Sequence, residues 1–388
     1  MIPWRYNLRN LFVRSTTSAM TSFGVAMVVM VTFSLIAFVE GLRRTVTFAA
    51  QDKNCVILAR GMTVEPASSI TREQYEILRS RPEIAKGQDD QPLLSPEMVT
   101  GFQPEAPSPS SGPQLLTFVR GVYPIAYQVH NFMRFLKGRA PAPGSDELAV
   151  GCKLAQRYSE LSLDQSVRFG RRQWMIVGIF SDRGSARESE AWADLDVLQQ
   201  DIQYRKTYNT LHATLIPGGE ESLSKTLRGD SRLNLDVVSE RRFYSDQANL
   251  ANQLQKMGLV VALVLGIGVA FGGMNTMYSA LARRSREIGV LRALGFGRLN
   301  VTLSFLCESL CLALVGAFAG EIMGLLVLAI ISFSGRLMTV GGFLFPLYPS
   351  ATAFISGLTI AVLVGVFGGI FPALRAARQN VIDALHRV

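Results

Sequence analysis

Long apolar runs alternate with short basic segments along this chain of 388 residues. An α-helix needs roughly 20 apolar residues to cross a bilayer. Four runs reach that length: Ala19–Val39, Met257–Leu281, Val301–Phe333 and Ala351–Phe371. The third run is longer than a bilayer requires, so we expect its last turns to tilt or to leave the hydrocarbon layer. The pattern predicts four transmembrane helices.

The arginines predict the orientation of these spans. They precede the first span, separate the second from the third and follow the fourth, at Arg5, Arg9, Arg14, Arg283, Arg284, Arg286, Arg292, Arg298, Arg375, Arg378 and Arg387. The loop between the third and fourth spans carries only Arg336. The positive-inside rule therefore places both termini and the arginine-rich loop in the cytoplasm.

The N-terminus is expected to stay attached. Basic residues precede the first apolar run, as in a signal peptide, but the run is too long and lacks a small-x-small cleavage site before Glu40. In the opening segment Ile2–Arg14, Trp4 and Leu8 share one helical face. This pattern predicts a helix lying on the cytoplasmic leaflet, with a plain extension of the first span as the alternative.

Roughly 210 residues separate the first two spans and must lie outside the cytoplasm. Strand patterns occur at Cys55–Ala59, Gln114–Arg120, Glu147–Val150, Ser166–Phe169, Gln173–Phe180, Thr210–Ile216 and Leu233–Val238. Helical patterns occur at Thr71–Ser80, Cys152–Leu161, Ala193–Tyr204 and Glu220–Leu227. Thr71 with Gln74 three residues later forms a capping-box pattern, and Gly170–Arg172 predicts a hairpin turn. The mixture predicts an α+β domain.

We find no pattern typical of an enzyme in this domain. His130 and His212 lack the spacing of metal ligands, and the scattered carboxylates are expected to lie on a solvated surface. The Pro/Ser-rich segment Gly101–Pro113 predicts a mobile loop, and the charged segment Asp182–Glu190 a surface loop. We therefore expect no catalytic, cofactor-binding or metal-binding residue.

Polar residues within the spans need a reason, because charges are costly in a bilayer. Asn275 lies in the second span, and Glu308 and Glu321 lie in the third. The two glutamates could relay protons, or Glu308 and Asn275 could form hydrogen bonds between helices. Outside the cytoplasm, Cys55 and Cys152 could form a disulfide, which sequence does not decide.

Glycines in the spans recur at spacings that allow close helix packing, within the chain or across a dimer. They are Gly266, Gly268, Gly272, Gly273, Gly316, Gly320 and Gly324.

The segment Ala282–Arg298 joins the second and third spans. Ile288, Leu291 and Leu294 follow one another at i, i+3 and i+6, and Gly295 is expected to end the helix. A basic amphipathic helix between two spans is suited to receive force from a soluble cytoplasmic partner.

These residues resemble a known family. Met274–Asn275, Arg283–Gly295, Glu308 and the closing Phe371–Leu385 resemble the FtsX-like permease domain of ABC transporters. The outer segments Val119–Val122, Lys137–Arg139, Leu148–Gly151 and Val177–Phe180 resemble the MacB-type periplasmic core. The resemblance implies a helical membrane protein with four transmembrane helices and an α+β extracytoplasmic domain inserted between helices 1 and 2.

The resemblance also implies partners. They are a P-loop ABC ATPase dimer that holds ATP and Mg, a second permease copy in a homodimer or heterodimer, and, for some members, a periplasmic adaptor and an outer-membrane channel; no nucleic acid is implied. The location implied is the bacterial inner membrane. The helix that docks on the ATPase would consist of Arg283, Arg284, Arg286, Glu287, Ile288, Leu291, Arg292 and Leu294.

The expected division of the chain follows from these arguments. The segments are a cytoplasmic interfacial helix (1–18), transmembrane helix 1 (19–41), the extracytoplasmic domain with its stalk (42–250), transmembrane helix 2 (251–281), the cytoplasmic coupling helix (282–300), transmembrane helix 3 (301–333), an extracytoplasmic loop (334–350), transmembrane helix 4 (351–374) and a cytoplasmic tail (375–388).

Several functions remain open on sequence alone. Because the chain has no Gly-x-x-x-x-Gly-Lys-Ser/Thr loop, we expect the ATPase to be a separate subunit and this chain not to be an enzyme. The favoured hypothesis is a permease subunit that transmits ATP-driven motion outward to export or extract an amphiphile, peptide or lipoprotein. Alternatives are an FtsX-type regulatory complex without transport, a proton-coupled transporter using Glu308 and Glu321, and a membrane-anchored sensor.

Overall fold

The computed structural model describes residues 15–48, 51, 53–87, 89–102, 117–203, 207–230, 232–333, 337–340 and 343–378. The chain forms two compact units. The helical unit comprises Met1–Glu40, Asn252–Phe333 and Tyr348–Val388, and the outer unit comprises Gly41–Ala251 and Ser334–Leu347. The expected interfacial helix before residue 15 and most of the Pro/Ser-rich segment lie outside the described residues.

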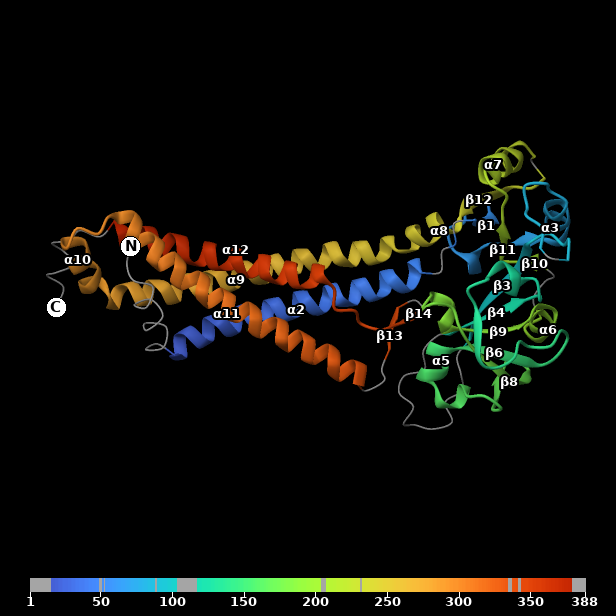
Figure 1. Ribbon diagram of the computed structural model, residues 1–388, viewed down its shortest axis with the longest axis horizontal. Coiled ribbons are helices and arrows are strands. Elements are labelled where there is room, and N and C mark those ends of the chain that lie inside the picture. Colours follow the sequence, from blue (N-terminus) through green and yellow to red (C-terminus); the bar gives the residue numbers. More distant parts are fainter. Residues whose placement is uncertain are drawn as a thin grey trace. The chain divides into compact units, whose positions relative to one another are not determined.

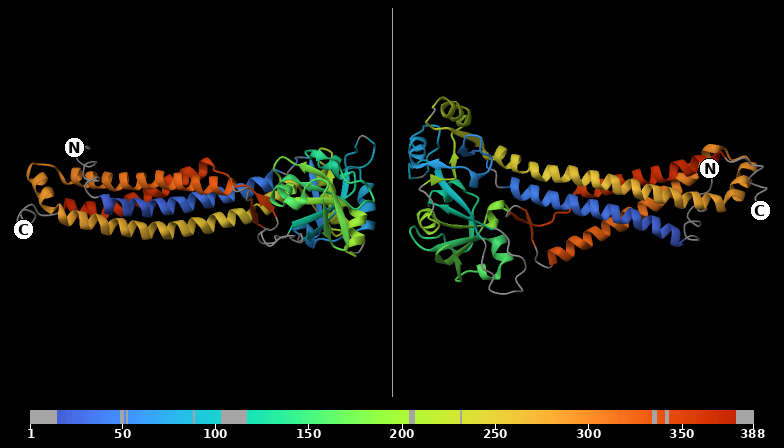
Figure 2. Two further views of the ribbon diagram at one scale, coloured as in Figure 1. Left: turned by 90° about the horizontal axis from the view of Figure 1, so that it is seen from below. Right: turned by 180° about the vertical axis from the view of Figure 1, so that it is seen from behind.

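The four predicted spans are confirmed as long apolar helices. The helices are α2 (Ser15–Thr47), α9 (Asn249–Arg283), α11 (Arg298–Phe333) and α12 (Ala351–Ala377), with the short α10 (Ser285–Ala293) between α9 and α11. By length and composition, four helices of the described chain can cross a membrane. In both sets of views these four helices run alongside one another (Figure 1, Figure 2).

Small residues let these helices approach closely. The centre of the bundle is formed by Val25 and Val29 of α2, Ala270 of α9, Ala313 and Ala317 of α11, and Ala361 and Val364 of α12. A methyl group at Gly320 would lie 2.5 Å from the carbonyl oxygen of Ala26, so only glycine allows this contact between α11 and α2. The glycines of α11 therefore serve packing within the chain, whereas Gly268 and Gly272 of α9 have no such neighbour within 4 Å.

The outer unit is built on a mixed sheet. Its ten strands are β1 (Asn54–Ala59), β3 (Leu94–Phe102), β4 (Thr117–Val122), β5 (Arg134–Gly138), β6 (Glu147–Gly151), β7 (Ser166–Phe169), β8 (Arg172–Ser181), β9 (Glu190–Asp194), β11 (Thr210–Thr214) and β12 (Leu235–Ser239). Their order is β12-β1-β11-β3-β4-β9-β6-β8-β5, with β7 beside β8. The pairs β4–β9 and β6–β8 are parallel and the others antiparallel. The predicted α+β class is confirmed.

Short helices surround this sheet (Figure 1). They are α3 (Arg72–Arg79), α4 (Ala126–Val129), α5 (Cys152–Arg157), α6 (Leu195–Asp201), α7 (Gly219–Gly229) and α8 (Glu240–Gln247), with the 3-10 turns η1 (Glu65–Ala67), η2 (Ser159–Leu161) and η3 (Ala186–Ser189) and the small β2 (Ile70–Thr71)–β10 (Thr207–Tyr208) pair. The capping box at Thr71 and Gln74 is present, and β7 and β8 form the hairpin predicted at Gly170. Local sequence thus defines these elements.

Two predictions for the outer unit were wrong. Asp182–Glu190 is not a surface loop, because most of its residues are buried and its charges pair with other buried groups. The helix expected from Ala193 begins only at Leu195, because Ala193 and Asp194 complete the buried strand β9. Cys55 and Cys152 are free thiols rather than a disulfide.

The segment between α11 and α12 belongs to the outer unit. It forms the strand pair β13 (Met338–Val340) and β14 (Phe343–Phe345), and Leu344 of β14 is part of the main hydrophobic core of the sheet. The loop expected to connect two spans is therefore a structural piece of the extracytoplasmic domain.

Candidate functional site

Helix α10 carries the residues expected to contact a partner. Ile288 is 3% exposed and packs with Met277 of α9, Phe305 of α11 and Ala373 of α12. One apolar side chain thereby fixes the short helix against three long ones. The side chain of Leu291, its predicted companion, lies outside the described residues.

The predicted apolar stripe does not continue to Leu294. Leu294 is 72% exposed, because six residues at about 100° each turn it well away from Ile288 and the helix has ended at Ala293. Gly295 ends the helix with a φ of 92°, as expected. The exposed face instead combines Glu287 with Val290, which is 45% exposed and which sequence reasoning missed.

Arg284 is separated from the other arginines of this segment. It is 7% exposed, and its Nη1 lies 3.1 Å from Oε2 of Glu308, itself 6% exposed, in α11. Glu308 thus pairs with Arg284, which local sequence did not indicate, rather than with Asn275. The residue before α10 is in this way bound to the first half of α11, and Arg284 is not at the surface with the other basic residues.

The remaining basic residues differ in accessibility. Nη1 of Arg292 donates to the carbonyl oxygen of Ala377 at 2.6 Å, which links the end of α10 to the end of α12. Nε of Arg283 donates to the carbonyl oxygen of Ser279 one turn earlier. Arg283 and Arg286 are both exposed, so they form a basic surface beside Glu287.

The other polar residues of the spans lie apart. Asn275 is exposed on α9, and Glu321 is half-buried in α11. A carboxylate oxygen of Glu321 would lie 3.4 Å from a methyl group at Gly357 of α12. The structure therefore brings together Arg284 and Glu308 but not Asn275, Glu308 and Glu321.

A buried charge cluster lies inside the outer sheet. Arg120 of β4 binds Glu65 and Glu97 at 2.8 Å each and Glu190 at 2.7 Å, and all four residues are less than 9% exposed. These carboxylates were expected on a solvated surface, and that expectation was wrong. The four residues of the cluster come from β3, β4, β9 and η1, so they meet only when the sheet has folded.

His130 and His212 complete this cluster. Nε2 of His130 lies 2.7 Å from Glu97, and Nε2 of His212 lies 2.9 Å from Glu65. Glu97, His130 and His212 have possible metal-ligand atoms within 4.8 Å of one another. The carboxylate of Glu97 already binds Arg120, however. The Nε2 atoms of His130 and His212 are each in a hydrogen bond with a glutamate. These contacts fit a buried ion-pair network better than a metal centre, although Nδ1 of each histidine is buried without a hydrogen-bond partner among the described residues.

The cluster changes the titration of its members. Burial raises the pKa of Glu65, but the Arg120 charge and the hydrogen bond from His212 outweigh it and lower this pKa to about 2. Burial lowers the pKa of His212, but Glu97 and Glu65 outweigh it and raise this pKa. For His130, burial and the charge of Arg187 prevail, and its pKa is lowered. The network holds Glu65 ionised far below neutral pH.

Arg187 of η3 connects this interior to the segment that leads into α9. It lies 3.2 Å from Asp182 and also binds Glu240, the first residue of α8. The other carboxylate oxygen of Glu240 accepts the backbone N–H of Gln51 at 3.0 Å, just after α2. Glu240 is 0% exposed. The buried carboxylate of Glu240 therefore binds the segment that follows α2, and Glu240 itself belongs to the segment that precedes α9.

Three segments connect the outer unit to the long helices: the stretch after α2, the stretch before α9 and the segment between α11 and α12. Ser189, two residues after Arg187, binds the third of these. Its hydroxyl accepts the N–H of Leu344 at 2.9 Å and lies 3.3 Å from the carbonyl oxygen of the same residue. Beside it, Glu188 accepts the backbone N–H groups of Asp182 and Gly184 at 2.8 Å each. We call Arg187–Ser189 the junction segment, because all three connecting segments bind it directly or through Glu240.

Comparison with known proteins agrees with this architecture. The family model of the MacB-like periplasmic core domain matches residues 18–227. The family model of the FtsX-like permease C-terminal region matches residues 259–381. The two matches join an outer core domain to a membrane region that carries the α10 segment, which defines a permease of the ABC transporter class. The chain belongs to the MacB-like family of FtsX-type permeases.

Individual relatives are distant. A macrolide export ATP-binding/permease protein MacB of Campylobacter jejuni is 27% identical over 247 residues, covering 59% of this chain and 36% of that protein. A pyoverdine export ATP-binding/permease protein PvdT of Pseudomonas entomophila is 25% identical, covering 63% and 38%. An ABC transporter permease of Methanocaldococcus jannaschii is 24% identical, covering 58% of each chain. The chain thus matches between 36% and 58% of the length of these relatives.

Among solved structures, the periplasmic region of MacB from Actinobacillus actinomycetemcomitans aligns with a TM-score of 0.38 and 11% identity. The alignment covers 52% of this chain and 95% of that one.

Proposed function

We propose that this chain is the permease subunit of an ABC system that transmits ATP-driven motion of a separate ATPase subunit to its extracytoplasmic domain. The motion would export or extract an amphiphile, peptide or lipoprotein. Membership in a family whose relatives are named as export proteins supports this proposal.

The observation that carries the proposal is the junction segment. Arg187 and Ser189 bind, directly or through Glu240, the stretch after α2, the start of α8 and the loop between α11 and α12. A domain joined to membrane helices only by flexible linkers would not follow the movement of those helices. Buried ion pairs and hydrogen bonds within the outer unit bind all three connecting segments to one another, so a displacement of any one of them would act on the sheet.

Within the helical unit, α10 has the features of a docking element. Ile288 and Arg284 fix it to α9, α11 and α12, whereas Glu287 and Val290 remain exposed. We propose that a P-loop ATPase dimer, which would hold ATP and Mg, binds this face in the cytoplasm. A push on α10 would then reach the three long helices through the contacts of Ile288.

A second permease copy is also proposed, as a homodimer or heterodimer. A methyl group added at Gly268 or Gly272 of α9 would meet no other element of the described chain within 4 Å, which leaves a face where another helix can approach. A periplasmic adaptor and an outer-membrane channel are further partners that the system would need if its substrate leaves the cell.

The first test is purification of the tagged chain from its native membrane in mild detergent, followed by mass spectrometry. We expect a P-loop ATPase at about one copy per permease. Glu287→Arg and Leu291→Ala should weaken its recovery without changing the permease dimer. Recovery of a well-folded permease without any ATPase would contradict the proposal.

The same experiment separates transport from regulation. A co-purifying adaptor or a bound amphiphile supports export or extraction. A co-purifying cell-wall hydrolase, with no bound substrate, would instead support the FtsX-type regulatory complex.

A further inference from the structure

A cavity of about 550 Å³ lies in the outer unit next to the end of α2. Its wall contains three basic side chains, Lys53, Arg183 and Arg241, and none of its described lining residues is acidic. It belongs to neither the buried Arg120 cluster nor α10. A cavity of this size is suited to a small ligand or to the headgroup of a larger one.

Arg183 is held in place for binding. The backbone N–H groups of its two neighbours, Asp182 and Gly184, both donate to the buried carboxylate of Glu188 at 2.8 Å. Its own φ is 52°, a left-handed conformation that the turn enforces. Its guanidinium lies 3.7 Å from the centre of the Phe132 ring. A charged group fixed in this way loses little conformational freedom when it binds an anion.

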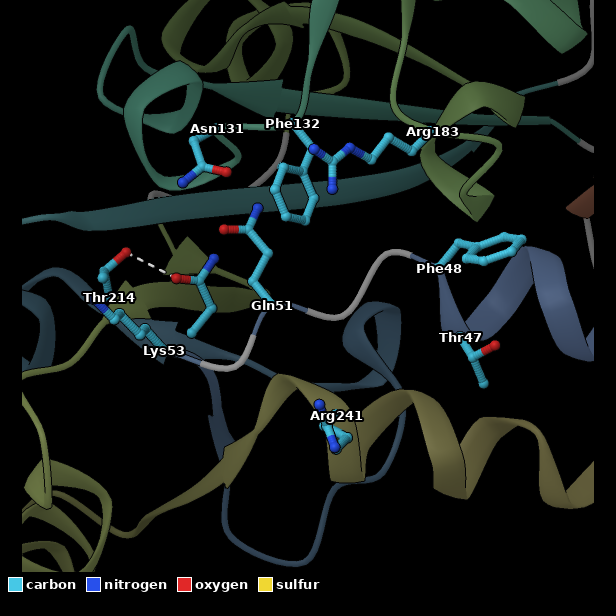
Figure 3. A pocket seen from close by; sticks show the side chains of 10 residues that line it. Thr47, Phe48, Gln51, Lys53, Asn131, Phe132, Arg183, Thr214 and Arg241 are labelled. Atoms are coloured by element: carbon cyan, nitrogen blue, oxygen red, sulfur yellow. Dashed lines mark hydrogen bonds between the residues drawn. The ribbon is translucent and has the colours of Figure 1, made fainter.

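Gln51 supplies an unused donor in the same wall. It is 8% exposed, and its side-chain Nε2 is buried without a hydrogen-bond partner, although its backbone N–H binds Glu240. Figure 3 shows Gln51, Phe132 and Arg183 extending into the same space. A buried donor without a partner costs about 1–3 kcal/mol. An acceptor oxygen bound in the cavity would remove that cost.

The cavity is also lined by two aromatic residues, and one of them follows a membrane-spanning helix directly in the sequence. Phe48, 53% exposed, and Phe132 line it together with the basic groups. Phe48 directly follows Thr47, the last residue of the apolar helix α2. A free inorganic anion would leave the exposed ring of Phe48 uncovered, whereas the acyl chains of a lipid would contact it.

We propose that this cavity of the outer unit binds the phosphate headgroup of an anionic amphiphile. The guanidinium of Arg183 and the ammonium of Lys53 would bind the phosphate oxygens, Gln51 would donate to one of them, and Phe48 and Phe132 would cover the adjoining apolar part. The inference goes beyond force transmission, because binding requires no ATPase. It places the ligand beside Gln51, whose backbone is bound to the junction segment through Glu240.

Direct binding to the purified full chain in neutral detergent tests the proposal, without ATP or an ATPase. The probes are dioctanoyl phosphatidylglycerol, dioctanoyl phosphatidylcholine and inorganic phosphate. We expect the anionic lipid to bind at least tenfold more tightly than the zwitterionic one. Inorganic phosphate should compete only at much higher concentration. Equal affinity for the two lipids would overturn the proposal, and phosphate competing as well as phosphatidylglycerol would overturn its assignment to a lipid headgroup.

Variants locate the site. Arg183→Gln and Lys53→Gln should each weaken phosphatidylglycerol binding at least fivefold, whereas Arg228→Gln, the same change at an exposed arginine of α7 outside the cavity, should not. Gln51→Met should weaken binding while leaving the thermal unfolding temperature unchanged or raised, because it removes the unpartnered donor. Binding unaffected by all three cavity variants would refute the site whatever the outcome of the ATPase purification.

Discussion

The backbone N–H of Gln51 donates to Glu240 across 189 positions of sequence, at 3.0 Å and away from solvent. The same carboxylate binds Arg187 through its other oxygen. The stretch that follows one apolar helix and the stretch that precedes the next therefore have one common attachment. Loss of that attachment should affect both stability and force transmission.

Arg187→Met should strongly destabilise the outer unit. Removing one partner of a buried ion pair leaves the other charge uncompensated, at a typical cost of about 3–5 kcal/mol, and here both Asp182 and Glu240 lose a partner. Chemical unfolding of the full chain, followed by tryptophan fluorescence, measures the change. Arg183→Met is the control at an exposed arginine four residues earlier, and an equal loss of stability in the two variants would contradict the prediction.

The contact between Arg284 and Glu308 should behave as a structural pair. Arg284→Met and Glu308→Gln should each lower the stability of the helical unit, and the double variant should lose less than the sum of the two. Thermal unfolding in detergent gives the three values. If Glu308 instead relays protons, Glu308→Gln would abolish a pH-dependent transport activity while Arg284→Met preserved it.

The exposed apolar residues of α10 should matter for ATPase recruitment. Val290→Ser and Leu294→Ser, at residues 45% and 72% exposed, should reduce the ATPase recovered with the permease severalfold without destabilising the chain. Leu136→Ser is the matched control, since Leu136 is 61% exposed but lies in β5 of the outer unit. A similar reduction in all three would show that α10 has no special role.

Gly320→Ala should loosen the contact between α2 and α11. The added methyl group would lie 2.5 Å from the carbonyl oxygen of Ala26, and overpacking of this kind costs about 1–3 kcal/mol. Gly268→Ala provides the comparison, because there the added group would meet no other element of the described chain within 4 Å. Unfolding temperatures of the two variants in detergent should differ, with Gly320→Ala the lower.

Acid should destabilise the outer unit through the Arg120 cluster. The folded-state pKa of Glu65 is about 2 against an ordinary value of 4.5, so its contribution is present above pH 4.5 and is lost as pH falls toward 2. The full loss corresponds to roughly 3 kcal/mol. The pKa of His130 is lowered and that of His212 is raised, so these two histidines change the stability in opposite directions as pH falls. Unfolding measured from pH 7 to pH 3 should show a shallower acid slope for Glu65→Gln, whereas the exposed-site change Glu76→Gln should keep the wild-type slope.

The features that sequence predicted are those encoded locally. The capping box at Thr71 needs only residues three apart, and the hairpin at Gly170 needs only two adjacent strands. Apolar length defined the four long helices, and a helix-ending glycine placed the end of α10. In each of these cases the interacting residues are neighbours in the sequence.

The features that sequence missed depend on partners far along the chain. Arg187 looks like a surface residue until its partner Glu240, 53 positions away, is placed beside it. Arg120 binds carboxylates 23, 55 and 70 positions away. Arg284 was grouped with the exposed arginines because Glu308 belongs to the next long helix. No local pattern distinguishes a buried, paired charge from a solvated one.

The position of Leu344 in the core of the outer sheet has a consequence for biosynthesis. The ribosome completes α9, α10 and α11 before it reaches β14. The sheet, which is synthesised earlier, therefore lacks Leu344 in its core until β14 has been made. In the proposed topology, with the outer unit outside the cytoplasm, this unit can reach its final stability only after α11 has been inserted and the following loop has crossed the membrane. Maturation of the extracytoplasmic domain would therefore report that membrane insertion has nearly finished, and a chain that stalls earlier would expose an incomplete domain to proteases.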